Sequence, residues 1–188
     1  MKKLEVMIML LLCLLTGACS TVSDDDEVEE RVKVGDRVPV FTVDVVADGM
    51  STTFSTSHLT GETVIVFFHT SCADCQRELP VLDDYYRQHR DDPGFQMVAI
   101  SRAEGAETVA AFWAEHGLQM PYSAQEDRRV YDLFASAIIP RVYVVSPQGF
   151  VTRILVESQL FFIKKRSCTP EMSYSSMSKI YKNIGKLL

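Results

Sequence analysis

An apolar run that ends at two closely spaced cysteines constrains the fold more than any other stretch of the chain. Residues 63–68 are almost wholly apolar, as expected of a central strand covered on both faces. After the polar residues 69–71, Cys72 and Cys75 open a stretch with helical periodicity that runs to about Arg90. The first thiol would lie at a helix N-terminus, where unpaired N–H groups and the helix dipole stabilise a thiolate. Because the two thiols lie one helical turn apart, we interpret them as a redox pair.

The remaining composition excludes several other classes of protein. The 188 residues include five cysteines, too few for a disulfide scaffold. No second Cys-x-x-Cys or His-x-x-x-His accompanies the first pair, so the spacing of a zinc finger is missing. The net charge of −6 argues against a nucleic-acid partner. We therefore expect no metal, and no cofactor other than the Cys72–Cys75 disulfide itself.

The N-terminus, residues 1–18, has the pattern of a secretory signal peptide. A short basic start precedes the apolar run Val6–Leu15, which is too short to span a bilayer. The residues that follow resemble a bacterial lipobox, in which Cys19 becomes the lipidated first residue of the mature protein. Thr16 stands where leucine is usual and, with Ala18, also fits an ordinary signal-peptidase site. Both alternatives predict export to the cell envelope, and the lipoprotein adds a membrane anchor on the periplasmic or the outer surface.

The rest of the chain divides into three parts by composition. Residues 19–33 are expected to form a disordered tether, since residues 24–30 carry six acids and no base. An acidic cluster after a lipidated cysteine also resembles the surface-export signals of Bacteroidetes lipoproteins. A globular domain is expected over 34–156. Residues 157–188 form a C-terminal segment, with a helix expected over 172–188.

Strand and helix patterns alternate along the globular domain. The Asp48-Gly49 pair predicts a hairpin turn near its start. Strands separated by helices argue for an α/β fold, with an antiparallel hairpin at the end of the order. The expected strands cover 41–46, 51–54, 63–68, 95–100, 141–146 and 150–156, and the expected helices cover 72–90, 107–116 and 127–134.

The chemistry of thiol–disulfide exchange assigns a role to each cysteine. A thiolate attacks a substrate disulfide, and a second thiol resolves the resulting mixed disulfide. We assign Cys72 as the nucleophile and Cys75 as the resolving thiol. Glu78, three residues further along the helix, either moves a proton to or from Cys75 or faces solvent. Asp74 should disfavour the Cys72 thiolate by repulsion, which favours a reductant over an oxidant.

Ile139 and Pro140 form a second constellation, directly before an expected strand. A proline at this position indicates a cis bond at a tight turn, with an ordinary trans proline as the alternative. If this turn packs beside Cys72, the backbone of Ile139 can pair with an extended substrate. Pro140 would then keep the two thiols from capturing a metal.

Together these features resemble the thioredoxin-like superfamily, specifically the membrane-anchored TlpA/ResA-like thiol–disulfide oxidoreductases. The resemblance implies a thioredoxin-like fold, with a central mixed sheet flanked by helices and an N-terminal β-hairpin. It also implies protein thiols or disulfides as substrates, together with an electron donor or acceptor. It makes Glu78 the active-site glutamate and Pro140 the cis-proline. The segments that carry it are Val34–Pro39, Cys72-x-x-Cys75-x-x-Glu78-x-Pro80, Val98–Ser101, Ile139–Arg141 and Pro147–Gly149.

The chain departs from the family pattern at three places. Ser71 replaces the tryptophan usual before the first cysteine, which makes the substrate-binding lip of the site more polar. The dipeptide Ala73-Asp74 leaves the redox direction open. The tail after Val156 does not follow the family, and we interpret its Cys168 as a bystander.

Two other functions compete with the oxidoreductase. A peroxiredoxin-like peroxidase shares the superfamily, but its chemistry requires a Pro-x-x-x-Thr/Ser-x-x-Cys loop, and His69 stands three residues before Cys72. The other is a non-catalytic binding module of thioredoxin fold, whose thiols are vestigial or bind metal.

Overall fold

The computed structural model describes residues 30–156. The predicted signal peptide, the lipidation site at Cys19, most of the acidic tether and the C-terminal segment 157–188 lie outside the described residues. Within the described range, no helix is long and apolar enough to cross a membrane.

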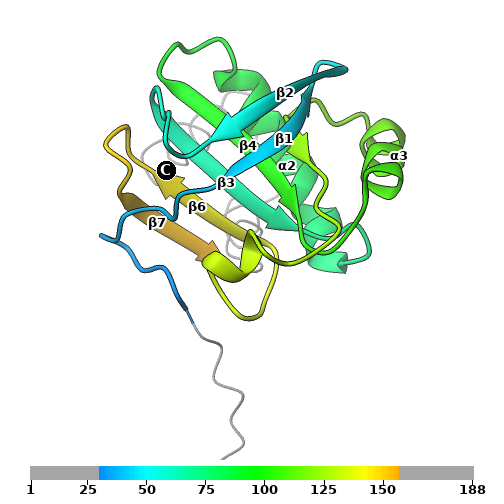
Figure 1. Cartoon of the computed structure of the whole chain (residues 1–188). Coiled ribbons are helices and arrows are strands. Elements are labelled where there is room, and N and C mark those ends of the chain that lie inside the picture. Colours follow the sequence, from blue (N-terminus) through cyan, green and yellow to red (C-terminus); the bar gives the residue numbers. More distant parts are fainter. Residues whose placement is uncertain (1–29, 157–188) are drawn as a thin grey trace, which may run out of the picture.

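A seven-stranded mixed sheet forms the centre of the domain, in the order β2-β1-β5-β4-β3-β6-β7 (Figure 1). β3 (Glu62–Phe68) runs parallel to β4 (Phe95–Ser101) and antiparallel to β6 (Arg141–Val145). β7 (Val151–Val156) pairs with β6 at one edge. Residues 64–68 are 0% exposed, because the central strand is covered on both faces. The apolar run thus forms the predicted central strand, and the mixed sheet confirms the predicted fold class.

The N-terminal hairpin forms where the sequence predicted it. β1 (Thr42–Ala47) and β2 (Met50–Ser55) are antiparallel and joined by Asp48 and Gly49. These two residues have φ values of 50° and 75°, the left-handed conformation that a two-residue hairpin turn requires at both positions. The sequence did not predict β5 (Tyr122–Ser123), a strand of two residues that joins the hairpin to β4.

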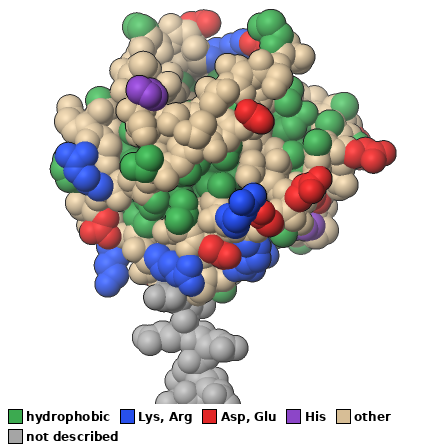
Figure 2. All heavy atoms as spheres, viewed as in Figure 1, with side chains coloured by type: hydrophobic (Ala, Val, Ile, Leu, Met, Phe, Trp, Pro, Cys, Tyr) green, Lys and Arg blue, Asp and Glu red, His purple; other side chains and the backbone are tan. Residues whose placement is uncertain are grey.

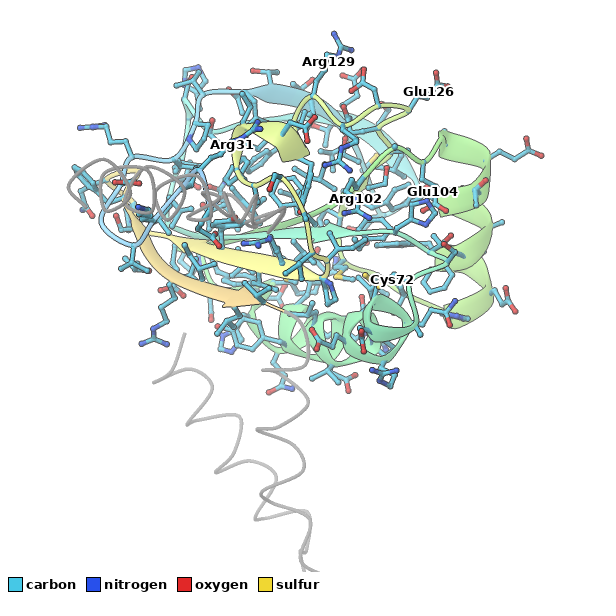
Figure 3. All side chains as sticks on the ribbon, turned by 90° about the horizontal axis from the view of Figure 1, so that it is seen from below. Arg31, Cys72, Arg102, Glu104, Glu126 and Arg129 are labelled. Carbon is cyan, nitrogen blue, oxygen red and sulfur yellow. The ribbon has the colours of Figure 1, made fainter. Side chains whose placement is uncertain are left out.

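Two helices pack on the sheet through the faces predicted from their periodicity. α2 (Ala73–His89) buries Leu79, Leu82 and Tyr86, and α3 (Ala106–His116) buries Val109, Phe112 and Trp113. α3 ends at Gly117, whose φ of 61° is typical of a left-handed helix cap. Viewed along the sheet, α2 lies on one side, and the N-terminal segment lies on the other with the loop that precedes β6 (Figure 3).

The helix predicted over residues 127–134 is wrong. Only a 3₁₀ turn, η1 (Tyr131–Leu133), forms there. The backbone N–H groups of Leu133 and Phe134 donate to the carbonyls three residues before them, at 3.2 and 2.9 Å, which is the hydrogen bonding of a 3₁₀ turn. Of the apolar residues that predicted the helix, Phe134 lies in the core and Leu133 is exposed, while Tyr131 is buried beside Phe134.

Residues 30–33, which the sequence analysis placed in the tether, pack on the domain. Val32 is 3% exposed, and the backbone N–H groups of Arg31 and Val32 both donate to the Phe134 carbonyl. Glu30 pairs with Arg141 at 2.7 Å. The packed part of the chain therefore includes the end of the acidic segment.

Acidic and basic side chains are interspersed on the face shown in Figure 2, with hydrophobic side chains between them. Exposed ion pairs also occur, such as Arg128 with Asp132 at 3.1 Å. Because solvent screens such pairs, they contribute little to stability. The buried sheet and the helices packed on it supply most of the stabilisation.

Candidate active site

The structure places Cys72 at the N-cap of α2. Its Sγ accepts a hydrogen bond from the backbone N–H of Cys75 at 3.4 Å, the geometry of a helix cap. Cys72 is half-buried, Cys75 is 0% exposed, and both are free thiols. The first sulfur can therefore meet a substrate, while the second lies behind it.

Burial raises the pKa of the Cys75 thiol well above its ordinary value. The hydrogen bond with Cys72 and the negative charge of Glu78 act in the same direction. Cys75 is therefore a protonated thiol at neutral pH. It must lose this proton before it can attack a mixed disulfide.

Glu78 lies inside the protein, at 2% exposure, on the turn of α2 that follows Cys75. The alternative in which this carboxyl faces solvent is therefore excluded. Its charge helps to raise the pKa of the Cys75 thiol, so the two groups are close, and proton exchange between them stays a prediction.

The second constellation lies directly against the first. The Ile139–Pro140 bond is cis, as the sequence predicted. The Cys72 thiol donates to the Ile139 carbonyl at 3.6 Å. β6 begins at Arg141, which pairs with Phe67 of β3, so the cis-proline lies next to the strand end that leads to Cys72. The structure thus brings together residues that lie 67 positions apart in the chain.

Ile138, just before this cis bond, has a φ of +70°. A β-branched residue rarely adopts this left-handed conformation, which costs on the order of 1–3 kcal/mol. Its carbonyl accepts hydrogen bonds from the Tyr131 hydroxyl at 2.9 Å and from Arg141 Nε at 3.0 Å. These two donors hold the loop in the conformation that presents Ile139 to Cys72.

Ser71 lies exposed directly before Cys72 and contacts its neighbour His69. Its hydroxyl lies 2.9 Å from His69 Nδ1, and its backbone N–H donates to the same nitrogen at 3.2 Å. His69 therefore orders the turn before Cys72.

Glu104 is a site residue that sequence reasoning missed. This carboxylate is 7% exposed and accepts hydrogen bonds from the Thr70 backbone N–H, at 2.8 Å, and from the Thr70 hydroxyl. One of its oxygens lies 3.6 Å from His69 Nδ1. In Figure 3, Glu104 lies at the same end of the sheet as Cys72. The signal was present in the topology, because residues that follow two neighbouring parallel strands meet at one edge.

Asp74 forms an exposed ion pair with Arg77, one turn further along α2. The positive guanidinium offsets part of the repulsion that Asp74 exerts on a Cys72 thiolate. The hypothesis that Asp74 favours the reductant direction stays a prediction, with a smaller expected effect.

Comparisons with known proteins agree with this arrangement. The model of the AhpC/TSA family matches residues 34–154. The thiol–disulfide oxidoreductase ResA of Oceanobacillus iheyensis is 27% identical over 154 residues, which cover 80% of this chain and 78% of that protein. ResA of Bacillus subtilis is 27% identical over 128 residues, 68% of this chain and 69% of that protein.

Solved structures show the same fold. The thioredoxin domain of a Bacteroides vulgatus thiol–disulfide oxidoreductase superposes with a TM-score of 0.58 at 19% identity, over 73% of this chain and 99% of that one. StoA of Bacillus subtilis superposes with a TM-score of 0.53 at 20% identity, over 65% of this chain and 91% of that one. The predicted resemblance and enzyme class are confirmed. The chain belongs to the AhpC/TSA family and is a thiol–disulfide oxidoreductase of thioredoxin-like fold.

Proposed function

We propose that the chain is an exported, lipid-anchored enzyme that exchanges its Cys72–Cys75 dithiol with disulfides of protein substrates. One observation supports the exchange chemistry: the half-buried Cys72 sulfur caps α2 and contacts the Ile139 carbonyl, with the buried Cys75 one turn behind. This geometry suits a nucleophile that meets an extended substrate and a second thiol that substrate does not reach. Export and the anchor are inferred from the N-terminal sequence.

The first step is attack by the Cys72 thiolate on one sulfur of the substrate disulfide. A bond forms between Cys72 Sγ and that sulfur, the substrate S–S bond breaks, and the second substrate sulfur leaves as a thiolate. The helix N-terminus stabilises the attacking thiolate. The leaving thiolate then takes a proton from water.

The second step needs the proton of Cys75 to be removed. The Glu78 carboxylate accepts this proton, and the Cys75 sulfur attacks Cys72 Sγ. The mixed disulfide breaks, the Cys72–Cys75 disulfide forms, and the first substrate sulfur is released. Two electrons have passed from the enzyme to the substrate, and an electron donor must reduce the enzyme again.

We assign substrate binding to the two loops that flank Cys72. The Ile139 backbone faces the sulfur and is placed to pair with an extended chain, and Ser71 offers an exposed hydroxyl at the lip. An extended backbone in a protein substrate fits this site because it presents N–H and C=O groups in a row.

A disulfide-reduction assay on insulin tests the activity. We expect the wild-type protein, with a dithiol donor, to reduce insulin, and the Cys72→Ser and Cys75→Ser variants to lose this activity. Peroxide consumption that survives in Cys75→Ser would instead support the peroxidase. No turnover by the wild type, with a retained metal, would support the binding module.

Lipidation at Cys19 requires a test of its own, because Cys19 lies outside the residues that the structure describes. We expect metabolic labelling with palmitate to mark the wild-type protein in a bacterial envelope fraction, and Cys19→Ala to abolish the label. Cys13→Ala serves as the matched control, because this cysteine lies inside the apolar run of the signal peptide. A label that persists in Cys19→Ala contradicts the anchor.

A further inference from the structure

Arg141 is the largest fully buried side chain of the described residues, at 1% exposure. It follows the cis-proline directly and begins β6. A guanidinium does not shed its charge at accessible pH, so burying it is costly unless it is paired and hydrogen-bonded. Its partners therefore show what this charge does in the protein.

These partners lie on two separate segments. Arg141 Nε donates to the carbonyl oxygens of Ala137 at 3.1 Å and Ile138 at 3.0 Å. Nη1 donates to both carboxylate oxygens of Glu30, each at 2.7 Å. The Tyr143 hydroxyl adds a hydrogen bond to Glu30 at 3.2 Å. Burial alone lowers the pKa of Arg141, but the hydrogen bonds and charges of Glu30 and Tyr143 together outweigh it, so the pKa is raised.

The loop that Arg141 holds carries the contact to the nucleophile. Ile138 is kept at its φ of +70° by two hydrogen bonds to its carbonyl, one of them from Arg141. The carbonyl of the next residue, Ile139, lies 3.6 Å from Cys72 Sγ. A shift of the Ile138 carbonyl would therefore move the backbone that faces the reacting sulfur.

Glu30 comes to this loop from the N-terminal end of the described chain. It lies 111 positions before Arg141, at the end of the acidic segment 24–30. It also forms a β-bridge with Ala135, and the two residues after it donate to the Phe134 carbonyl. The segment that leads into the domain is thus fastened to the loop that precedes the cis-proline.

We propose that Arg141 and Glu30 are positioning residues for the substrate-binding loop: Arg141 fixes the Ile138 carbonyl, and Glu30 supplies the counter-charge that keeps Arg141 there. This inference rests on the proposed exchange at Cys72. It adds that binding of a peptide substrate depends on how the end of the tether engages the domain.

Three variants separate positioning from stability. Glu30→Gln removes the counter-charge, Arg141→Met removes the donor to the loop, and the double variant Glu30→Met with Arg141→Met removes the buried guanidinium together with its partly exposed partner. Replacing a buried ion pair by apolar residues of similar size often leaves stability unchanged. Glu115→Gln, an exposed carboxylate on α3, is the control that loses the same charge.

KM and kcat are measured with a disulfide-bridged peptide and with hydroxyethyl disulfide, which needs only the thiolate. For all three variants we expect KM for the peptide to rise at least about tenfold, as the loss of one charge-assisted hydrogen bond implies. Turnover of hydroxyethyl disulfide, which has no peptide backbone to pair with Ile139, should fall much less than turnover of the peptide. The double variant should recover the urea midpoint of the wild type and keep the raised KM.

Two outcomes overturn the inference. One is a Glu30→Gln variant that behaves like Glu115→Gln. The other is a double variant that recovers the peptide KM together with the urea midpoint, which would make the pair merely structural. If the wild type reduces neither disulfide, the proposed function fails. Amide hydrogen exchange then tests separately whether Glu30 positions the loop. Faster exchange over 136–141 in Glu30→Gln, with 62–68 unchanged, supports it, and equal exchange contradicts it.

Discussion

The two thiols of the pair lie one helical turn apart in surroundings of different kinds. Cys72 is half-buried and surrounded by backbone and polar groups: the N–H of Cys75, the Ile139 carbonyl, and the turn that Glu104 anchors. Cys75 is enclosed in the core beside Glu78. The first step therefore depends on the positions of the backbone and polar groups around Cys72, whereas the second depends on removal of the Cys75 proton.

The largest effect should come from Glu78→Gln, which removes the proton acceptor and keeps the shape of the side chain. We expect the resolving step to slow by on the order of 10²-fold, the lower range for a lost general base, with the first step unchanged. Rapid quenching and mass spectrometry of the mixed disulfide measure the two steps separately. Asp84→Asn, an exposed carboxylate on the same helix, is the control. Equal slowing of both steps would contradict a role of Glu78 in the resolving step alone.

Glu104→Ala should affect the first step of the exchange, the attack by Cys72. It leaves the Thr70 backbone N–H without its acceptor, and the unfolding free energy should fall by about 1–3 kcal/mol. The first step should slow for peptide and small disulfides alike, because the turn before Cys72 loses its anchor. Urea denaturation and the same quenched reaction measure both effects, with the exposed Glu126→Ala as control. An unchanged first step would show that Glu104 serves stability alone.

The raised pKa of Cys75 predicts a pH dependence of stability. Below its ordinary value of 9.0, the thiol is protonated in both folded and unfolded states. Above that pH, the unfolded state releases the proton and the folded state keeps it, so the unfolding free energy of the reduced protein falls. The slope should approach about 1.4 kcal/mol per pH unit.

This dependence is measured as the difference between the wild type and Cys75→Ala, since other groups titrate in the same range. The difference should be constant below pH 9.0 and shrink above it. A constant difference throughout would show that Cys75 is not the buried, protonated member of the pair.

The smallest effect belongs to Asp74→Asn. Removal of the negative charge favours the thiolate and hence the reduced form, so the reduction potential should rise. Since Arg77 pairs with Asp74 at the surface, we expect a shift of at most about 20 mV, the equivalent of ~1 kcal/mol for two electrons. Equilibration with glutathione measures it. A fall in potential would contradict the electrostatic argument for a reductant.

Local patterns in the sequence predicted most of the fold. The apolar run, the Asp48-Gly49 turn and the helical faces of α2 and α3 each depend on residues close in the chain. The prediction failed over 127–134, where backbone hydrogen bonds join residues three apart and close only a 3₁₀ turn. It also missed β5, since two residues carry no periodicity.

The candidate site divides in the same way. Cys72, Cys75 and Pro140 follow from motif and spacing, and the cis bond has the predicted form. The groups that hold the site could not be predicted, because they meet only in the folded chain. Glu104 contacts Thr70 across 34 positions, and Glu30 reaches Arg141 across 111.

Trapping of the mixed disulfide tests the central claim most directly. Each single variant, Cys72→Ser and Cys75→Ser, is mixed with a disulfide-bridged peptide, and the products are identified by intact mass and peptide mapping. The account predicts that Cys75→Ser accumulates a peptide bound to Cys72, and that Cys72→Ser accumulates none, because Cys75 is buried and protonated. A peptide trapped on Cys75 in the Cys72→Ser variant, with none on Cys72 in the other, would contradict it.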